Sequence, residues 1–221
     1  MDLASLAFPA AWEIAGFLVA LPILAAALYR APWSRFAASE PVHVWYGTIF
    51  CVIVLWSVRA TVGEGFTFHL LGMAALTLIA GAPLALVGGA IVLTVSIAVG
   101  GGAWSNAGLA YAAMVAVPVA TVSAVLRAAE RFLPPNFFVY VFVAAFFGAA
   151  LSLAIEGVTG AILLTLGAGR SAALVFGEYV PYLVYLAFGE ATLTGMILTL
   201  AIVYRPQWVA SFDDARYIVN R

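Results

Sequence analysis

Residues 65–126 read GFTFHLLGMAALTLIAGAPLALVGGAIVLTVSIAVGGGAWSNAGLAYAAMVAVPVATVSAVL and contain no Asp, Glu, Lys or Arg. A helix needs about 20 apolar residues to cross a bilayer. These 62 residues are therefore too many for two crossings and suit three. Gly81-Ala82-Pro83 and Gly100-Gly101-Gly102 are the natural breaks in the run. We expect helices near 66–80, 84–99 and 107–126.

Further apolar runs lie on both sides of this stretch, at residues 12–29, 42–58, 137–166 and 173–204. Each of the last two is long enough to be one tilted helix or a helix broken at its glycines. Taking each as one crossing predicts seven helices, and either broken helix would raise the count to eight or nine. We prefer seven. The predicted fold is an all-α polytopic transmembrane bundle that forms a single domain over 1–221.

The composition excludes several classes of protein. Hydrophobic residues make up 66% of the 221-residue chain and charged residues only 9%, whereas soluble domains carry about 25% charged residues. A soluble enzyme, a nucleic-acid-binding protein and a disordered chain are therefore excluded. The sequence has no P-loop, no H-E-x-x-H and no G-x-S-x-G motif. We expect an integral membrane protein that is not an enzyme, whose oligomeric state stays open.

The nine positive charges are all arginines, and their distribution tests the helix count. With seven crossings, one side of the membrane receives seven of them: Arg30, Arg35, Arg127, Arg131, Arg205, Arg216 and Arg221. The other side receives only Arg59 and Arg170. Cytoplasmic loops carry the excess of arginine. We therefore expect the N-terminus outside, the C-terminus inside, and 205–221 as a short cytoplasmic tail at the membrane interface.

Ionisable residues at membrane depth are expensive and are candidates for function. Glu156 and Glu190 lie inside apolar runs. Each fits a structural hydrogen bond or a proton or cation relay. Glu190 falls in the outer half of the membrane, and we expect it to point into the bundle toward His69 or a Thr hydroxyl.

His69 and Met73 are four residues apart, so a helix would place both on one face. Imidazole and thioether together suit a late divalent metal or Cu(I). The same pair is also common in apolar helices that bind nothing. Arg59 and Glu64 precede His69 on the outer side and are expected to form an interfacial ion pair. Asn136 opens the sixth helix and completes the candidate polar residues.

The order of several motifs resembles a known family. HLLGMAALTLIAGAPLALVGGAIVLTV (69–95), GGAWSNAGLAYAAMVAVPVA (101–120) and FGEATLTGMILTLAIVYRP (188–206) are similar to the cobalt/nickel-type membrane components of energy-coupling-factor transporters. The similarity covers most of 65–206. It implies a subunit that captures a divalent metal at its outer face and releases it inward. It further implies a coupling protein and ATPase subunits as partners, in the bacterial inner membrane.

The resemblance also implies which residues bind the metal. The family's site includes the N-terminus, a histidine at position 2 and a histidine matched here by His69. This chain has Asp2 instead, and a second family histidine is missing at Val99-Gly100-Gly101. The sequence therefore leaves open whether the site binds nickel, cobalt, another cargo or nothing. The alternative functions are a solitary structural or assembly factor that binds another membrane complex, and a proton or cation carrier built on Glu156 and Glu190.

Overall fold

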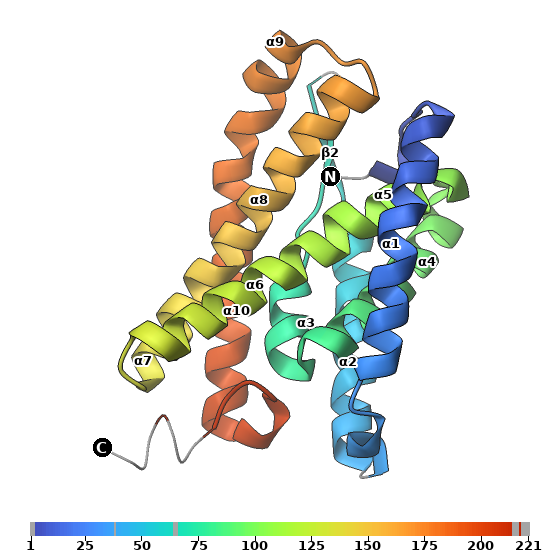
Figure 1. Ribbon diagram of the computed structural model, residues 1–221. Coiled ribbons are helices and arrows are strands. Elements are labelled where there is room, and N and C mark those ends of the chain that lie inside the picture. The colour runs from blue at the N-terminus through green and yellow to red at the C-terminus, as the bar shows by residue number, and fades with distance from the viewer. Residues whose placement is uncertain (1–2, 38, 64–65, 214–216, 218–221) are drawn as a thin grey trace.

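The computed structural model describes residues 3–37, 39–63, 66–213 and 217, and it is an all-helical bundle with one small hairpin (Figure 1). The α-helices are α1 (Ala10–Arg30), α2 (Ser39–Ser57), α3 (Met73–Ala80), α4 (Ala82–Gly100), α5 (Ala107–Ala110), α6 (Val117–Phe132), α7 (Phe137–Val139), α8 (Gly148–Ile162), α9 (Ala172–Leu174) and α10 (Val180–Tyr204). Short 3-10 turns are η1 (Leu3–Ser5), η2 (Trp33–Ala37), η3 (Trp104–Asn106) and η8 (Pro206–Trp208), and π-helical segments are η4 (Tyr111–Ala116), η5 (Tyr140–Phe147), η6 (Leu163–Gly167) and η7 (Val175–Tyr179).

Among the described residues, six helical segments are long and apolar enough to cross a membrane. They are α1, α2, α4, Trp104–Phe132, Phe137–Gly167 and Ala172–Tyr204. The last two run without interruption through their π-helical segments, so each is one span, as the seven-helix interpretation requires. Together with the short helix α3, the described part of the chain forms seven helices when each uninterrupted segment is counted once, and the predicted seven-helix bundle is confirmed. The breaks expected at Gly81 and at Gly100–Gly102 also lie where α4 begins and ends.

The third helix begins later than its sequence predicts, and the expected start near residue 66 is wrong. Residues Phe66–Phe68 form strand β2, which pairs antiparallel with β1 (Ala60–Val62). The helix starts only at Met73, because Gly72 adopts a left-handed conformation with φ +65°. All eight residues of α3 are buried. In Figure 1, α3 lies at the centre of the bundle, between α2, α4, α6 and α10.

The residues after α10 fold back onto the end of α3. The Ala210 and Ser211 backbone N–H groups donate to the Ile79 and Leu78 carbonyls, at 2.9 and 3.2 Å. The Ser211 hydroxyl also donates to the Leu78 carbonyl at 2.7 Å. These bonds satisfy carbonyls that the last turn of a helix leaves without partners. Of the predicted tail 205–221, the part up to Asp213 therefore packs on the bundle.

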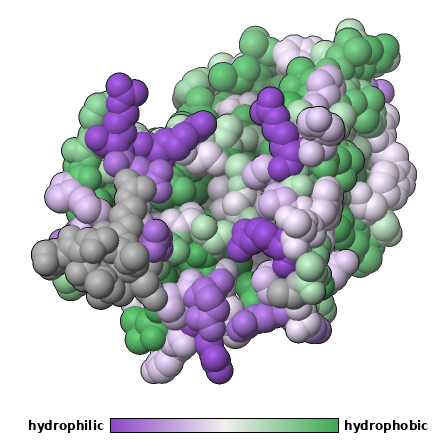
Figure 2. Space-filling model, turned by 60° about the horizontal axis from the view of Figure 1, so that its bottom comes forward, coloured by the Kyte–Doolittle hydropathy of each residue, from purple (hydrophilic) through white to green (hydrophobic). Residues whose placement is uncertain are grey.

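The bundle has two ends that differ in their elements. The lower end in Figure 1 carries the α1–α2 connection, the end of α3, the α6–α7 connection and the end of α10. There the Arg35 Nη1 donates to the Ala80 carbonyl at 3.4 Å, which ties η2 to α3. The upper end carries the β-hairpin and the α8–α9 connection. Figure 2 shows hydrophilic side chains gathered on the lower end, with apolar side chains around them.

Candidate functional site

His69 lies between β2 and α3 and is buried, with 5% of its surface exposed. Its ring packs on Trp56, with the ring centroids 4.9 Å apart. The Nδ1 atom is 3.0 Å from the Leu70 carbonyl oxygen. Because a carbonyl only accepts, Nδ1 carries the proton and donates, which leaves the lone pair on Nε2. This is the tautomer that a histidine requires when it binds a metal through Nε2.

Burial lowers the pKa of His69 from 6.5 to about 3. The imidazole is therefore neutral at physiological pH, and only the neutral ring binds a metal. The guanidinium of Arg59 lies within electrostatic range and acts in the same direction. The environment of His69 thus keeps one ring nitrogen ready to accept a cation or a hydrogen bond.

Met73 does not share a helix face with His69, and the premise of that pairing is wrong. The left-handed Gly72 separates the two residues, so only Met73 belongs to α3. Met73 is fully buried. Its Cε packs close to α4, where a Cβ added to Gly89 would lie 2.9 Å from it. The role of Met73 as a ligand stays a prediction without the geometric support that a shared helix face would have given it.

Glu190 points into the bundle, as expected, and is fully buried. Its polar partner is neither His69 nor a threonine, so that part of the expectation is wrong. The carboxylate oxygens accept hydrogen bonds from the backbone N–H groups of Leu71 and Gly72, at 2.9 and 2.7 Å. Consecutive N–H groups beside a left-handed residue form a concave anion-binding nest. The nest also lies at the N-terminus of α3, where a negative charge is favourable.

Trp56 holds the same segment from the opposite side. Its indole N–H donates to the Leu71 carbonyl at 2.8 Å. Both backbone polar groups of Leu71 are therefore engaged, one by α2 and the other by α10. The turn that carries His69 is fixed between these two helices before α3 begins.

Glu156 and Tyr179 extend this polar region into the other half of the bundle. Glu156 on α8 is 2% exposed and lies within electrostatic range of both Glu190 and Tyr179. The Tyr179 ring stacks on Phe68 of β2, with centroids 5.3 Å apart. Its hydroxyl group is buried and has no hydrogen-bond partner among the described residues. An unsatisfied buried hydroxyl is uncommon and marks a position where a further polar group fits.

The remaining candidates divide between the two ends of the bundle. Arg59 is at the upper end, where its Nη2 donates to the Ser96 hydroxyl at 2.8 Å. Its expected partner, Glu64, lies outside the described residues, as does Asp2.

Asn136 is not part of a polar cavity with His69. It is the N-cap of α7 at the lower end, and its side chain accepts from the Phe138 N–H at 2.8 Å. A residue that opens a helix commonly serves as a cap, which explains this position.

Two buried polar residues were not singled out from the sequence. The sequence does not distinguish Tyr179 as a site residue, because a tyrosine in an apolar run is typical of the membrane interface. Asn106 is 1% exposed, and its amide nitrogen donates to the Leu6 carbonyl. Its Oδ1 has no hydrogen-bond partner within the described part of the chain. The sequence feature that could have identified Asn106 is its polar amide within the charge-free stretch 65–126.

The site as described is incomplete for a metal. Among residues 3–37, 39–63, 66–213 and 217, no three His, Cys, Asp or Glu side chains gather to hold an ion. The structure instead brings together one buried imidazole, two buried carboxylates and an unsatisfied hydroxyl near the upper end of α3. Such a set can bind a cation, provided further donors complete it.

This fold and site define a polytopic membrane protein with a buried imidazole ahead of the short buried helix α3. Residues 3–208 match the sequence profile of the CbiM family, described as the cobalt uptake substrate-specific transmembrane region. The chain therefore belongs to the CbiM family and is a membrane component of metal uptake. The resemblance read from residues 69–206 is confirmed.

A solved structure described as a truncated transition metal transporter has the same fold. The two superpose with a TM-score of 0.76 at 13% sequence identity, over 91% of this chain and 96% of that one. Among curated proteins, none matches the sequence. The two chains thus share a fold although a pairwise identity of 13% carries little sign of it.

Proposed function

We propose that this chain captures a divalent transition-metal ion, such as nickel or cobalt, for an energy-coupling-factor-type transporter of the bacterial inner membrane. Its membership of a cobalt-uptake family supports this proposal. The chain carries no nucleotide-binding motif. A coupling protein and ATPase subunits therefore supply the energy for release of the ion.

The geometry of His69 is the observation that carries the proposal. Its Nδ1 is engaged by the Leu70 carbonyl, its ring is buried against Trp56, and its Nε2 keeps a lone pair. The bond to the Leu70 carbonyl satisfies a buried N–H donor and at the same time gives the ring a fixed tautomer. A metal ligand requires one, because the second nitrogen sets the orientation and basicity of the first.

The other ligands in this proposal come from the N-terminal residues. The family resemblance implies the terminal amine and residue 2, here Asp2, and both lie outside the described residues. An aspartate in place of histidine replaces a nitrogen donor with a harder oxygen donor. Oxygen donors shift preference from the late transition metals toward manganese and similar ions. We therefore propose a weaker nickel preference than a site with two histidines would have.

We also propose that the lower end of the bundle faces the cytoplasm. Arg35 and Arg205 lie in the connections at that end, and Arg30 and Arg131 lie in the last turns of α1 and α6, which end there, with Arg127 one turn earlier on α6. Arg59 and Arg170, in contrast, lie in the connections at the upper end (Figure 1). Positive charge is enriched on the cytoplasmic side. His69 then lies toward the outer face, where a capture site for an external ion belongs.

The alternative of a carrier built on Glu156 and Glu190 is less well supported. A relay requires a carboxylate that exchanges its proton partner. Glu190 accepts two backbone hydrogen bonds that would be left unsatisfied if it moved. These two hydrogen bonds favour a structural role for Glu190, in which it holds the turn next to the proposed metal site.

The proposal is tested by titrating the purified protein with Co²⁺, Ni²⁺ and Mn²⁺. Loss of an outer hydrogen-bond partner weakens metal sites about 10- to 100-fold. Removal of a ligand in His69→Ala should cost at least that much. His43→Ala is the matched control, because His43 is the other histidine and is exposed on α2. Equal affinity of His69→Ala and the wild type would contradict the proposal.

A further inference from the structure

A groove of about 810 Å³ lies between α2 and α10, with α3 as its floor. Both long helices pack against α3, so the short helix leaves an open channel between them. Its wall on α2 is formed by residues one turn apart: His43, Val44, Gly47, Thr48, Cys51, Val52 and Leu55. Its wall on α10 is formed in the same way by Leu193, Thr194, Ile197, Leu200, Ala201 and Tyr204. The groove therefore follows the two helices along the membrane.

The interior of the groove suits an apolar occupant. Its lining is chiefly aliphatic, and the Thr48 hydroxyl already donates to the Val44 carbonyl at 2.8 Å. Ile197 and Leu200 are 39% and 55% exposed in it. An added Cβ at Gly47 would meet nothing within 4 Å, so the α2 wall is open as well. The volume lies in the range of about 300–1,000 Å³ that small-molecule sites occupy.

The lower end of the groove carries the guanidinium of Arg205, which has no partner among the residues that the structure describes. Arg205 follows the last residue of α10, and no carboxylate among the described residues pairs with its guanidinium. The neighbouring polar groups are already engaged. The Trp208 indole donates to the Glu40 carboxylate at 2.8 Å, and His43 Nδ1 is 2.6 Å from the Ser39 carbonyl.

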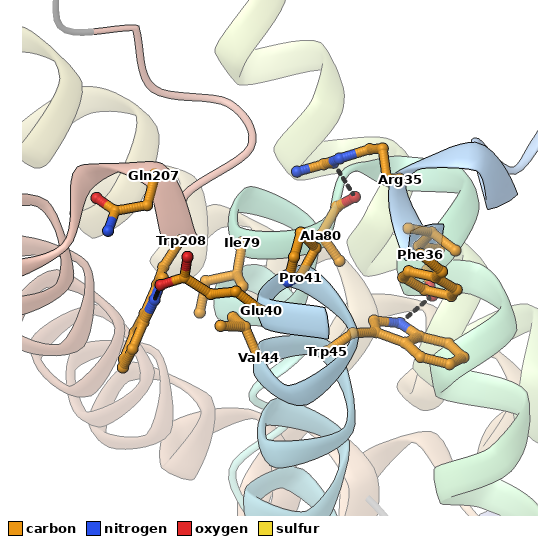
Figure 3. A pocket seen from close by; sticks show the side chains of 11 residues that line it. Arg35, Phe36, Glu40, Pro41, Val44, Trp45, Ile79, Ala80, Gln207 and Trp208 are labelled. Atoms are coloured by element: carbon orange, nitrogen blue, oxygen red, sulfur yellow. Dashed lines mark hydrogen bonds between the residues drawn. The ribbon is translucent and has the colours of Figure 1, made fainter. Parts of the chain in front are cut away.

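A smaller pocket of about 190 Å³ adjoins this end, and Trp208 lines both spaces (Figure 3). Arg35 and Gln207 project at the edges of the pocket, and Trp45 lies at its far side. This pocket continues the groove at the level where the apolar spans end, and Arg35, Glu40 and Gln207 are the polar residues of its mostly apolar lining. In a bilayer, this is the depth of lipid headgroups, where tryptophan and arginine gather.

We propose that the groove binds one membrane phospholipid, with its acyl chains between α2 and α10 and its phosphate on Arg205. The planar guanidinium matches a phosphate with paired hydrogen bonds. The groove is apolar along its length and ends at headgroup depth in a guanidinium that no described carboxylate neutralises, so it complements the apolar chains and the anionic phosphate of a phospholipid. A partner helix would fill the channel but would leave this cation without an anion.

The test is native mass spectrometry of the full chain purified in mild detergent. The wild type should retain one phospholipid. Arg205→Gln should weaken its retention about tenfold, the usual effect of losing a charged hydrogen bond. Ala201→Phe, which fills the groove, should also release it. Arg127→Gln and Val203→Phe are matched controls on exposed positions outside the groove, and both should retain the lipid.

Cys51 provides an independent readout, because it is the only cysteine and is exposed in the groove. A bound acyl chain should slow its reaction with maleimide, and Arg205→Gln should restore the fast rate. Three outcomes would overturn the proposal: folded wild type without a lipid, equal retention by all five proteins, or a groove protected by a second copy or another protein. Brominated phosphatidylglycerol and phosphatidylethanolamine, added back in turn, identify the preferred headgroup.

Discussion

The Glu190 carboxylate accepts a hydrogen bond from the Gly72 backbone N–H at 2.7 Å, although 118 residues separate them in the chain. The second carboxylate oxygen accepts from the Leu71 N–H at 2.9 Å. These bonds fix the turn between His69 and α3. The position of the imidazole therefore depends on a residue in the middle of the last helix.

Removing this carboxylate should destabilise the protein. Glu190→Ala leaves two buried N–H groups without acceptors, which should cost about 2–4 kcal/mol of unfolding free energy. Glu190→Gln keeps one acceptor oxygen and should cost less. Thermal unfolding in detergent measures both. Glu13→Gln on α1, whose side chain is only partly buried, is the control and should leave the transition unchanged. Equal transitions for Glu190→Ala and the wild type would contradict the capping role.

Substitution of Gly72 should be costly for two reasons. Its φ of +65° disfavours any residue with a Cβ by about 1–2 kcal/mol. An added Cβ would also lie 3.1 Å from both Val52 and Leu55. Gly101 has a similar φ of +72° but open space around it, so Gly101→Ala carries the backbone cost alone. Gly72→Ala should lower the melting temperature more than Gly101→Ala, and the reverse order would refute this account.

The stability of the protein should depend on pH through His69. Burial lowers its pKa to about 3 in the folded state, below the value of about 6.5 in an unfolded chain. The unfolded state then binds more protons, so the stabilisation is complete above that higher pKa and is lost as pH falls toward 3. At about pH 5 the loss is about 2 kcal/mol. His69→Gln should lose less stability than the wild type on acidification. Parallel pH profiles of the two proteins would contradict the lowered pKa of His69 in the folded state.

Much of the bundle was predictable, because apolar run lengths and Gly/Pro breaks follow from the cost of exposing the backbone to lipid. The hairpin was not. Phe66–Phe68 is too short to show a period, and its pairing with Ala60–Val62 is a tertiary fact. The inward direction of Glu190 followed from the cost of a carboxylate in lipid. The hydrogen-bond partner of Glu190 could not be predicted, because the two N–H groups of Leu71 and Gly72 converge only when Gly72 adopts its left-handed conformation.

The orientation of the chain can be read from reporter fusions. Fusions after Arg131 and after Arg221 should report the cytoplasm, and a fusion after Arg170 should report the outside. The reason is the concentration of arginine at the lower end, which positive-inside bias retains in the cytoplasm. A cytoplasmic signal after Arg170 would overturn both the orientation and the outward position of His69.

The central claim is that the Nε2 of His69 binds the transported metal, and X-ray absorption of the Co²⁺-loaded protein tests it most directly. We expect imidazole scattering at about 2.0–2.1 Å from the metal, the usual distance to a histidine nitrogen. This signal should persist in His43→Ala and vanish in His69→Gln. A loaded wild-type protein without imidazole scattering, or an unchanged spectrum in His69→Gln, would contradict the claim.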